Sequence, residues 1–134
     1  MRNEHKDVQT WIKQRYSAKY GVEAEVDKEN KLPNDIRRWY QPDVIMRAKD
    51  GRIKYIIEVE SDPTRKSIVG ACILADASLK ELNSRAQLYF VIYHQDGIRQ
   101  IHNFRTRVEI AKRYCGNLHV INVVSFEEFK KETL

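Results

Sequence analysis

Apolar residues recur along the first part of this 134-residue chain with the period of a helix and then of a strand. Residues 4–19 carry an apolar stripe at helical spacing, formed by Val8, Trp11, Ile12 and Tyr16. Gly21 is a typical helix stop. Residues 22–26 alternate as a half-exposed strand does, and polar residues 27–34 predict a loop.

The middle of the chain predicts a β-hairpin. Two runs rich in β-forming residues, 43–49 and 52–60, flank Asp50-Gly51, which is the strongest short-range hairpin signal. A loop of two residues, the usual length, would place Asp43 directly opposite Glu58. A loop of three residues would shift the pairing by one and turn Asp43 to the other face.

The next elements alternate between helix and strand. Asp62 followed by Pro63 predicts the start of a helix that runs to about residue 82. The continuous apolar run 88–93 predicts a strand buried on both faces. A helix between two such strands implies a right-handed parallel crossover.

The last part of the chain predicts a helix over 103–115, a strand over 118–124 and a short final helix. Ser125 and Glu128 form the capping box that opens this last helix. The predicted order is α-β-β-β-α-β-α-β-α. It indicates an α/β fold of three layers, with a mixed central sheet of about five strands and flanking helices.

Composition favours one domain over residues 1–134, because 42% hydrophobic residues are enough for a core. No apolar stretch is long enough for a membrane span, and the N-terminus lacks an apolar signal-peptide core. Cys72 and Cys115 lie in apolar helical contexts and indicate buried thiols in a reducing compartment. We therefore expect a cytoplasmic protein without a membrane partner.

Charge favours a polyanionic partner, since the net charge is +5 and the sequence pI is about 9.2. Basic residues are dense at Arg37-Arg38, just before Trp39-Tyr40, and at Arg65-Lys66. The alternative for each pair is an ordinary solvated helix face. Trp39 or Tyr40 could stack on an unpaired base, and core packing is the alternative.

Three carboxylates are expected at the open end of the hairpin. Asp43 would face Glu58 across the strands, and Glu60, two residues further on, would share their face. Crowded like charges need a cation or a proton, and hard oxygen ligands suit Mg²⁺ or Mn²⁺. A salt-bridged surface is the alternative, although Tyr55-Ile56-Ile57 before Glu58 lacks the polar alternation of an exposed strand.

Pro42-Asp43 followed by Glu58-Val59-Glu60, together with the element order, resembles the PD-(D/E)XK nuclease-like superfamily. This superfamily includes restriction endonucleases and archaeal Holliday-junction resolvases, and the resemblance in element order to the resolvases covers nearly the whole chain. It implies a restriction endonuclease-like fold and a Mg²⁺- or Mn²⁺-dependent endonuclease acting on DNA. Structured or branched DNA is one substrate form, and a homodimer stays open.

Asp43 and Glu58 correspond to the metal-binding carboxylates of that family. Glu60 stands where the family usually has lysine; some members with Glu there are active and others are inactive scaffolds. Glu60 could itself serve as a metal ligand or a general base. The family also has an acidic residue on its first helix, for which Glu4 is the candidate, and an exposed acid near a helix N-terminus is the alternative.

Two basic residues could replace the missing lysine. Arg65 and Lys66 open the helix that follows Glu60, and ordinary first-turn basic residues are the alternative. We assign Lys66 to catalysis, and Arg37, Arg38 and Arg65, with Trp39 and Tyr40, to nucleic-acid binding.

Three functions follow from these residues. The first is a metal-dependent DNA endonuclease, and the second is an inactive nuclease-fold module that binds nucleic acid or a protein. The third is a generic α/β domain whose basicity is incidental.

Overall fold

A five-stranded mixed sheet forms the centre of the protein in a computed structural model that describes residues 3–132 and 134. The strands lie side by side in chain order, the first three antiparallel and the last three parallel. They are β1 (Glu25–Val26), β2 (Val44–Arg47), β3 (Ile53–Glu60), β4 (Ala86–Ile92) and β5 (Leu118–Ser125). The α/β class and the mixed five-stranded sheet expected from the sequence are confirmed.

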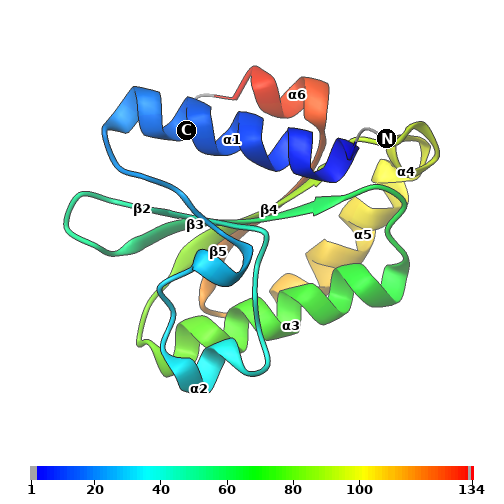
Figure 1. Ribbon diagram of the computed structural model, residues 1–134. Helices are drawn as coiled ribbons and strands as arrows, with labels where there is room; N and C mark the ends of the chain where they lie inside the picture. Colours follow the sequence, from blue (N-terminus) through cyan, green and yellow to red (C-terminus); the bar gives the residue numbers. More distant parts are fainter. Residues whose placement is uncertain (1–2, 133) are drawn as a thin grey trace.

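Helices cover both faces of this sheet and give three layers (Figure 1). On one face lie α1 (Glu4–Tyr20) and α6 (Phe126–Lys130), and on the other lie α2 (Asn34–Arg37), α3 (Arg65–Glu81) and α5 (Ile101–Lys112). A 3-10 turn, η1 (Asp27–Glu29), follows β1, and α4 (Gln95–Arg99) follows β4.

Each face of the sheet has its own hydrophobic core. On the α1 side, Ile12 and Tyr16 pack with Ile57 of β3 and Val91 of β4. On the α3 side a larger cluster includes Ile56, Ile68, Cys72, Leu79, Phe90 and Phe104. Residues 88–92 of β4 are all buried, so this strand is covered on both faces, as its unbroken apolar run predicted.

The hairpin between β2 and β3 differs from the predicted one in its loop. The Ala48 N–H donates to the Arg52 carbonyl at 2.8 Å, and the Gly51 N–H donates to the Ala48 carbonyl at 2.9 Å. Residues 49–51 therefore form a loop of three residues, and the expected two-residue loop is wrong. Gly51 closes it with φ 89°, a conformation that glycine adopts more readily than other residues.

A β-bulge cancels the effect of the longer loop. Arg47 pairs with Ile53, but Met46 pairs with Tyr55, so Lys54 is an extra residue on β3. Beyond the bulge Val44 pairs with Ile57, which is the register that the sequence predicted. Asp43 and Glu58 are the next residues on the two strands, so they still meet at the open end of the hairpin.

Helix boundaries confirm some predicted caps and correct others. Gly21 ends α1 with φ 67°, and Ser125 caps α6 through a capping box with Glu128, both as predicted. The start of α3 was predicted wrongly at Asp62-Pro63. Thr64 is its N-cap, and the Thr64 side chain accepts the Ser67 N–H.

Short elements are the other differences from the predicted order. Only Glu25–Val26 of the expected strand 22–26 pairs in the sheet, and the helices α2 and α4 were not predicted. Cys72 and Cys115 are both buried and free, as expected. Within residues 3–132 and 134, no helix has the length and apolarity needed to span a membrane.

Candidate metal and nucleic-acid site

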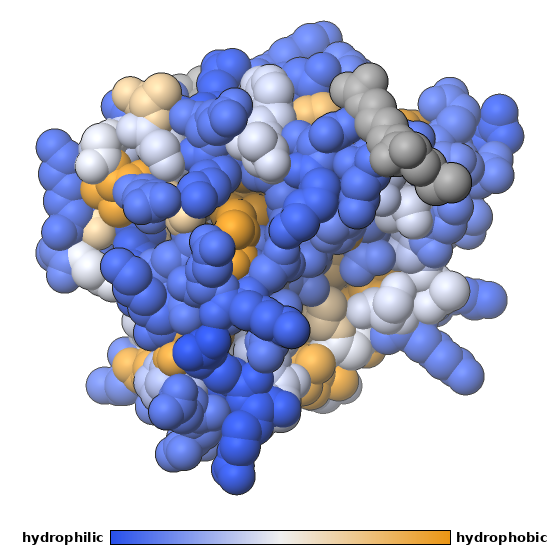
Figure 2. All heavy atoms as spheres, viewed as in Figure 1, coloured by the Kyte–Doolittle hydropathy of each residue, from blue (hydrophilic) through white to orange (hydrophobic). Residues whose placement is uncertain are grey.

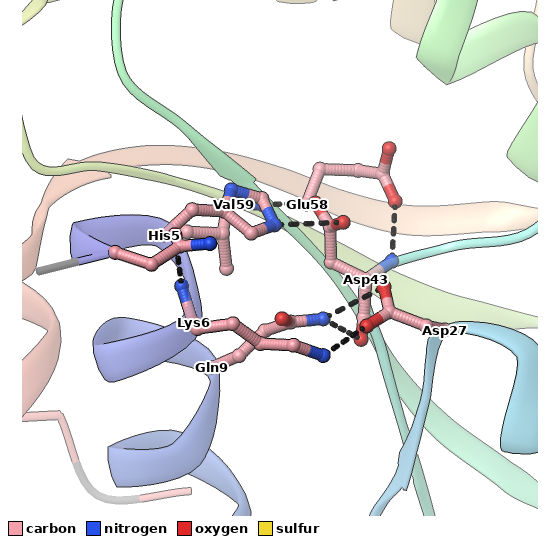
Figure 3. A network of polar contacts seen from close by, with 8 residues as sticks. His5, Lys6, Gln9, Asp27, Asp43, Glu58 and Val59 are labelled. Atoms are coloured by element: carbon pink, nitrogen blue, oxygen red, sulfur yellow. Dashed lines mark hydrogen bonds and ion pairs between the residues drawn. The ribbon is translucent and has the colours of Figure 1, made fainter. Parts of the chain in front are cut away.

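The open end of the hairpin holds two of the predicted carboxylates in direct contact with each other's strand. The Asp43 N–H donates to Glu58 Oε1 at 3.2 Å, and Asp43 Oδ2 accepts the Val59 N–H at 2.7 Å (Figure 3). Asp43 directly precedes β2, and its carboxylate accepts the Val59 N–H of β3 at the point where β2 no longer pairs with β3. The hairpin therefore fixes the backbone position of Asp43 against that of Glu58.

Glu58 and Glu60 lie on the α3 face of β3, since alternate residues of a strand point to the same side. They line an open hollow of about 410 Å³. The other residues that line it are Trp39, Tyr40, Gln41, Ser67, Gly70, Ala71 and Leu74. Among the described residues, none that lines this hollow is lysine or arginine.

All three predicted carboxyl groups are more easily protonated than usual. Burial raises the pKa of Glu58 well above its ordinary value, and the nearby Asp43 carboxylate raises it further. Burial also raises the pKa of Asp43, although the Val59 N–H and His5 act in the opposite direction. Burial, and then the charge of Asp43, raise the pKa of Glu60. The negative charge at this site is therefore poorly compensated by the protein itself.

Helix α1 contributes polar side chains to this site, and the sequence analysis did not identify them. His5 Nε2 lies 3.3 Å from Asp43 Oδ1. Gln9 Nε2 donates to the Asp43 carbonyl and to Asp27 Oδ1, each at 2.9 Å, and Lys6 Nζ lies 3.0 Å from Asp27 Oδ2 (Figure 3). The first two turns of α1 thus hold Asp43, just before β2, and Asp27, just after β1, through hydrogen bonds and ion pairs.

A sequence signal for these contacts existed. His5 and Gln9 are four residues apart, so they share a helix face, and that face also includes Val8 and Ile12 of the apolar stripe. Glu4, the acid predicted on this helix, is exposed. It lines a separate hollow with Asp7, Val8, Trp11, Tyr93 and Phe126. Its role as a metal ligand stays a prediction.

Asp27 differs from the three predicted acids. Although burial raises its pKa, the hydrogen bonds from Gln9 and Lys6 lower it, and the net pKa lies below the ordinary value. The protein therefore stabilises the charged form of Asp27, whereas the pKa values of Asp43, Glu58 and Glu60 are raised.

The two basic residues proposed to replace the family lysine are both exposed and border a different hollow. Arg65 and Lys66 line it together with Val69, Gly70, Ile73 and Arg107 of α5. The first-turn residue of α3 that faces the hollow of Glu58 and Glu60 is Ser67. The catalytic role of Lys66 stays a prediction.

The predicted nucleic-acid segment from Arg37 to Tyr40 divides into inner and outer residues. Arg37 donates to the Lys28 carbonyl at 2.6 Å, and its Nε is buried without a partner in the described part of the chain. Arg38 is exposed, and Trp39 is 39% exposed at the hollow of Glu58 and Glu60. Tyr40 is buried, so Trp39 is the better placed of the two rings for stacking on a base.

The Tyr40 hydroxyl is a buried polar group without a hydrogen-bond partner among the described residues. Burial raises its pKa well above the ordinary value, and the charges of Glu58 and then Asp43 raise it further. The Tyr40 O–H is therefore a neutral, buried donor close to these acids.

The carboxyl oxygens of Asp43, Glu58 and Glu60 do not form a compact ligand set. Within the described ranges, the ligand atoms that all lie within 4.8 Å of one another are those of a different group, Asp62, His94 and Asp96. That group is exposed, and His94 Nδ1 lies 3.0 Å from Asp62 Oδ1. An ion at the hairpin site would use one or two of its carboxylates at a time, which is usual for Mg²⁺.

Comparisons of this chain with protein-family models, with curated proteins and with solved structures gave no match.

Proposed function

We propose that the protein is a divalent-metal-dependent nuclease that hydrolyses phosphodiester bonds in DNA. The observation that carries this proposal is the contact between Asp43 and Glu58, in which poorly compensated acids are held at the end of a hairpin. The resemblance in element order and in the Asp43, Glu58 and Glu60 pattern supports the same reaction.

The residues present suit a hard cation. Carboxylate oxygens are the ligands that Mg²⁺ and Mn²⁺ prefer, and a cation would offset the burial and the repulsion that raise the pKa values of Asp43, Glu58 and Glu60. Asp43 and Glu58 would hold the ion, with Glu60 beside them. When bound, it would supply positive charge for the phosphate and lower the pKa of a bound water.

The chain's own residues would orient the reactants. The Val59 N–H fixes the Asp43 carboxylate, and His5 contacts its other oxygen. Glu60 could accept a proton from the attacking water, because burial raises its pKa and makes it a stronger base than an exposed carboxylate. Hydrolysis then adds water across one P–O bond and leaves a phosphate monoester and a hydroxyl.

A second candidate is a non-catalytic module of the same fold that binds nucleic acid or a protein. The observation that favours it is the absence of lysine and arginine among the described residues that line the hollow, together with Glu60 in the position of the family lysine.

A cleavage assay separates the two candidates. Wild type should cut DNA with Mg²⁺ or Mn²⁺ and not with EDTA, whereas Asp43→Asn and Glu58→Gln should lose about 100-fold or more of the rate because they weaken the metal site. Both variants should keep DNA binding, since removing acids lowers the repulsion of phosphates.

The exposed acid Glu109 on α5 provides the control, and Glu109→Gln should cut at the wild-type rate. Equal cleavage by Glu58→Gln and wild type would place the activity elsewhere. Binding without cleavage in wild type would favour the non-catalytic module.

A further inference from the structure

Gly70 lies in the interior of the 17-residue helix α3, where glycine stabilises a helix less than alanine does. Packing does not explain its presence, because a Cβ atom built on Gly70 would meet no atom within 4 Å apart from its chain neighbours and the nearby backbone of its own helix. Gly97 shows the opposite case, since its Cβ would lie 2.5 Å from the Ser61 carbonyl oxygen. The open space above Gly70 is therefore available to a bound molecule.

Gly70 also borders two hollows with opposite charge. One contains Glu58 and Glu60, and the other is lined by Arg65, Lys66 and Arg107. A ligand that crosses α3 at Gly70 would thus have one end at the acidic site and the other beside three basic side chains. A polymer of phosphates with a cation at the acidic end matches this distribution of charge.

The acidic hollow has an aromatic wall. Trp39 is 39% exposed there, beside Leu74, which is 38% exposed. Beneath them the buried Tyr40 hydroxyl has no partner in the part of the chain that the structure describes. Figure 2 shows hydrophobic residues in small separate groups among hydrophilic ones where Figure 1 places α2 and α3, which is unlike one large apolar docking face.

We infer that the surface of α3 around Gly70 binds one unpaired strand of nucleic acid. Trp39 stacks on an unpaired base, the backbone crosses Gly70, and Arg65, Lys66 and Arg107 neutralise the neighbouring phosphates. An unpaired strand fits better than a duplex because only an unstacked base offers its face to Trp39. The inference rests on the proposed function in one respect, namely that the phosphate to be cut lies at Glu58 and Glu60 while the rest of the strand extends toward the basic residues.

Trp39 fluorescence tests the inference directly. In a Trp11→Phe background, Trp39 is the only tryptophan of the chain. Titration in EDTA at low salt with an unpaired thymidine 12-mer should quench its emission, and a 12-base-pair duplex should bind at least about 10-fold more weakly. Affinity for the single strand should fall with salt at a slope of about −0.7 per neutralised phosphate. A uridine 12-mer distinguishes RNA from DNA.

Variants separate binding from folding. Trp39→Ala should weaken single-strand binding by about 5- to 100-fold, measured by anisotropy of labelled DNA. Gly70→Ala should raise the Tm by about 2–6 °C, and both Gly70→Ala and the bulkier Gly70→Leu should weaken binding, Gly70→Leu more strongly. Gly116→Ala is the matched control, because its Cβ would also meet no atom within 4 Å, and it should leave binding unchanged.

The possible results distinguish this inference from the proposed function. Single-strand binding that Trp39→Ala and Gly70→Leu weaken supports the inference, even if wild type cuts no DNA and the nuclease proposal fails. Equal affinity for duplex and single strand, or unchanged binding by Trp39→Ala and Gly70→Leu, overturns the inference. The nuclease proposal would still hold if wild type cuts DNA. Absence of binding to any nucleic acid overturns it and leaves a protein as the partner of this surface.

Discussion

At the scale of single residues, the site is defined by negative charge that the protein does not neutralise. Asp27 shows that the chain can satisfy an acid in this region, because Gln9 and Lys6 bind it and lower its pKa. Glu58 and Glu60 instead have raised pKa values, and the structure gives them no basic neighbour in the hollow among the described residues. Such acids are costly in the free protein and suit a site completed by a cation.

This charge predicts an unusual effect of Glu58→Gln on stability. A carboxyl group whose pKa is raised by folding favours the folded state at pH values below its ordinary pKa of 4.5. That stability is lost as pH rises through the raised pKa. In EDTA at pH 8, Glu58→Gln should therefore raise the Tm by about 3–6 °C, as measured by thermal unfolding.

The gain should shrink as the pH falls, because wild-type Glu58 is then protonated and also neutral. Glu109→Gln, at an exposed position, should leave the Tm nearly unchanged at every pH. A Glu58→Gln variant less stable than wild type at pH 8 would mean that the Glu58 charge is compensated in the folded protein.

At the scale of elements, the hairpin shows why a sequence can predict a register and still misjudge a loop. The Asp50-Gly51 signal was correct, but the loop has three residues and Lys54 forms a bulge that restores the pairing. The register of Val44 with Ile57 was predicted from the loop length, because residues 44–46 and 55–57 are buried on both faces and offer no alternation that would fix it. The bulge depends on local twist, which has no comparable sequence signal.

Contacts between elements were harder to predict than the elements. The stripe on α1 identified its buried face, but which polar residue reaches Asp43 depends on how the helix lies across the strands. His5 and Gln9 make those contacts, and Glu4 is exposed. Similarly, alternation placed Glu58 and Glu60 on one face, but only tertiary structure shows Trp39 beside them.

The start of α3 gives a prediction at this scale. Thr64 caps the helix, so Thr64→Ala should lower the free energy of unfolding by about 1 kcal/mol, measured by urea denaturation. Asp62, which the sequence suggested as the cap, pairs with His94 at the surface, so Asp62→Asn should change stability by less than about 0.5 kcal/mol. The reverse order of the two effects would show that the helix begins earlier.

At the scale of the whole molecule, the sheet separates two hydrophobic cores, and the candidate site lies where β2 begins and β3 ends. Asp43 is held from the α1 side by His5 and along the edge of β3 by Val59. Glu58 and Glu60 face α3. The basic residues are spread over the molecule, and the net charge of +5 would favour a polyanion beside this acidic centre.

The central claim is that Asp43 and Glu58 bind a divalent cation, and calorimetric titration with Mn²⁺ at pH 8 tests it most directly. Wild type should bind the ion, and Asp43→Asn and Glu58→Gln should weaken binding at least about 10-fold because each removes a charged ligand. Asp62→Asn, in the exposed group with His94 and Asp96, should bind as wild type does. Absence of Mn²⁺ binding, or binding that Asp62→Asn abolishes and Glu58→Gln keeps, would contradict the account.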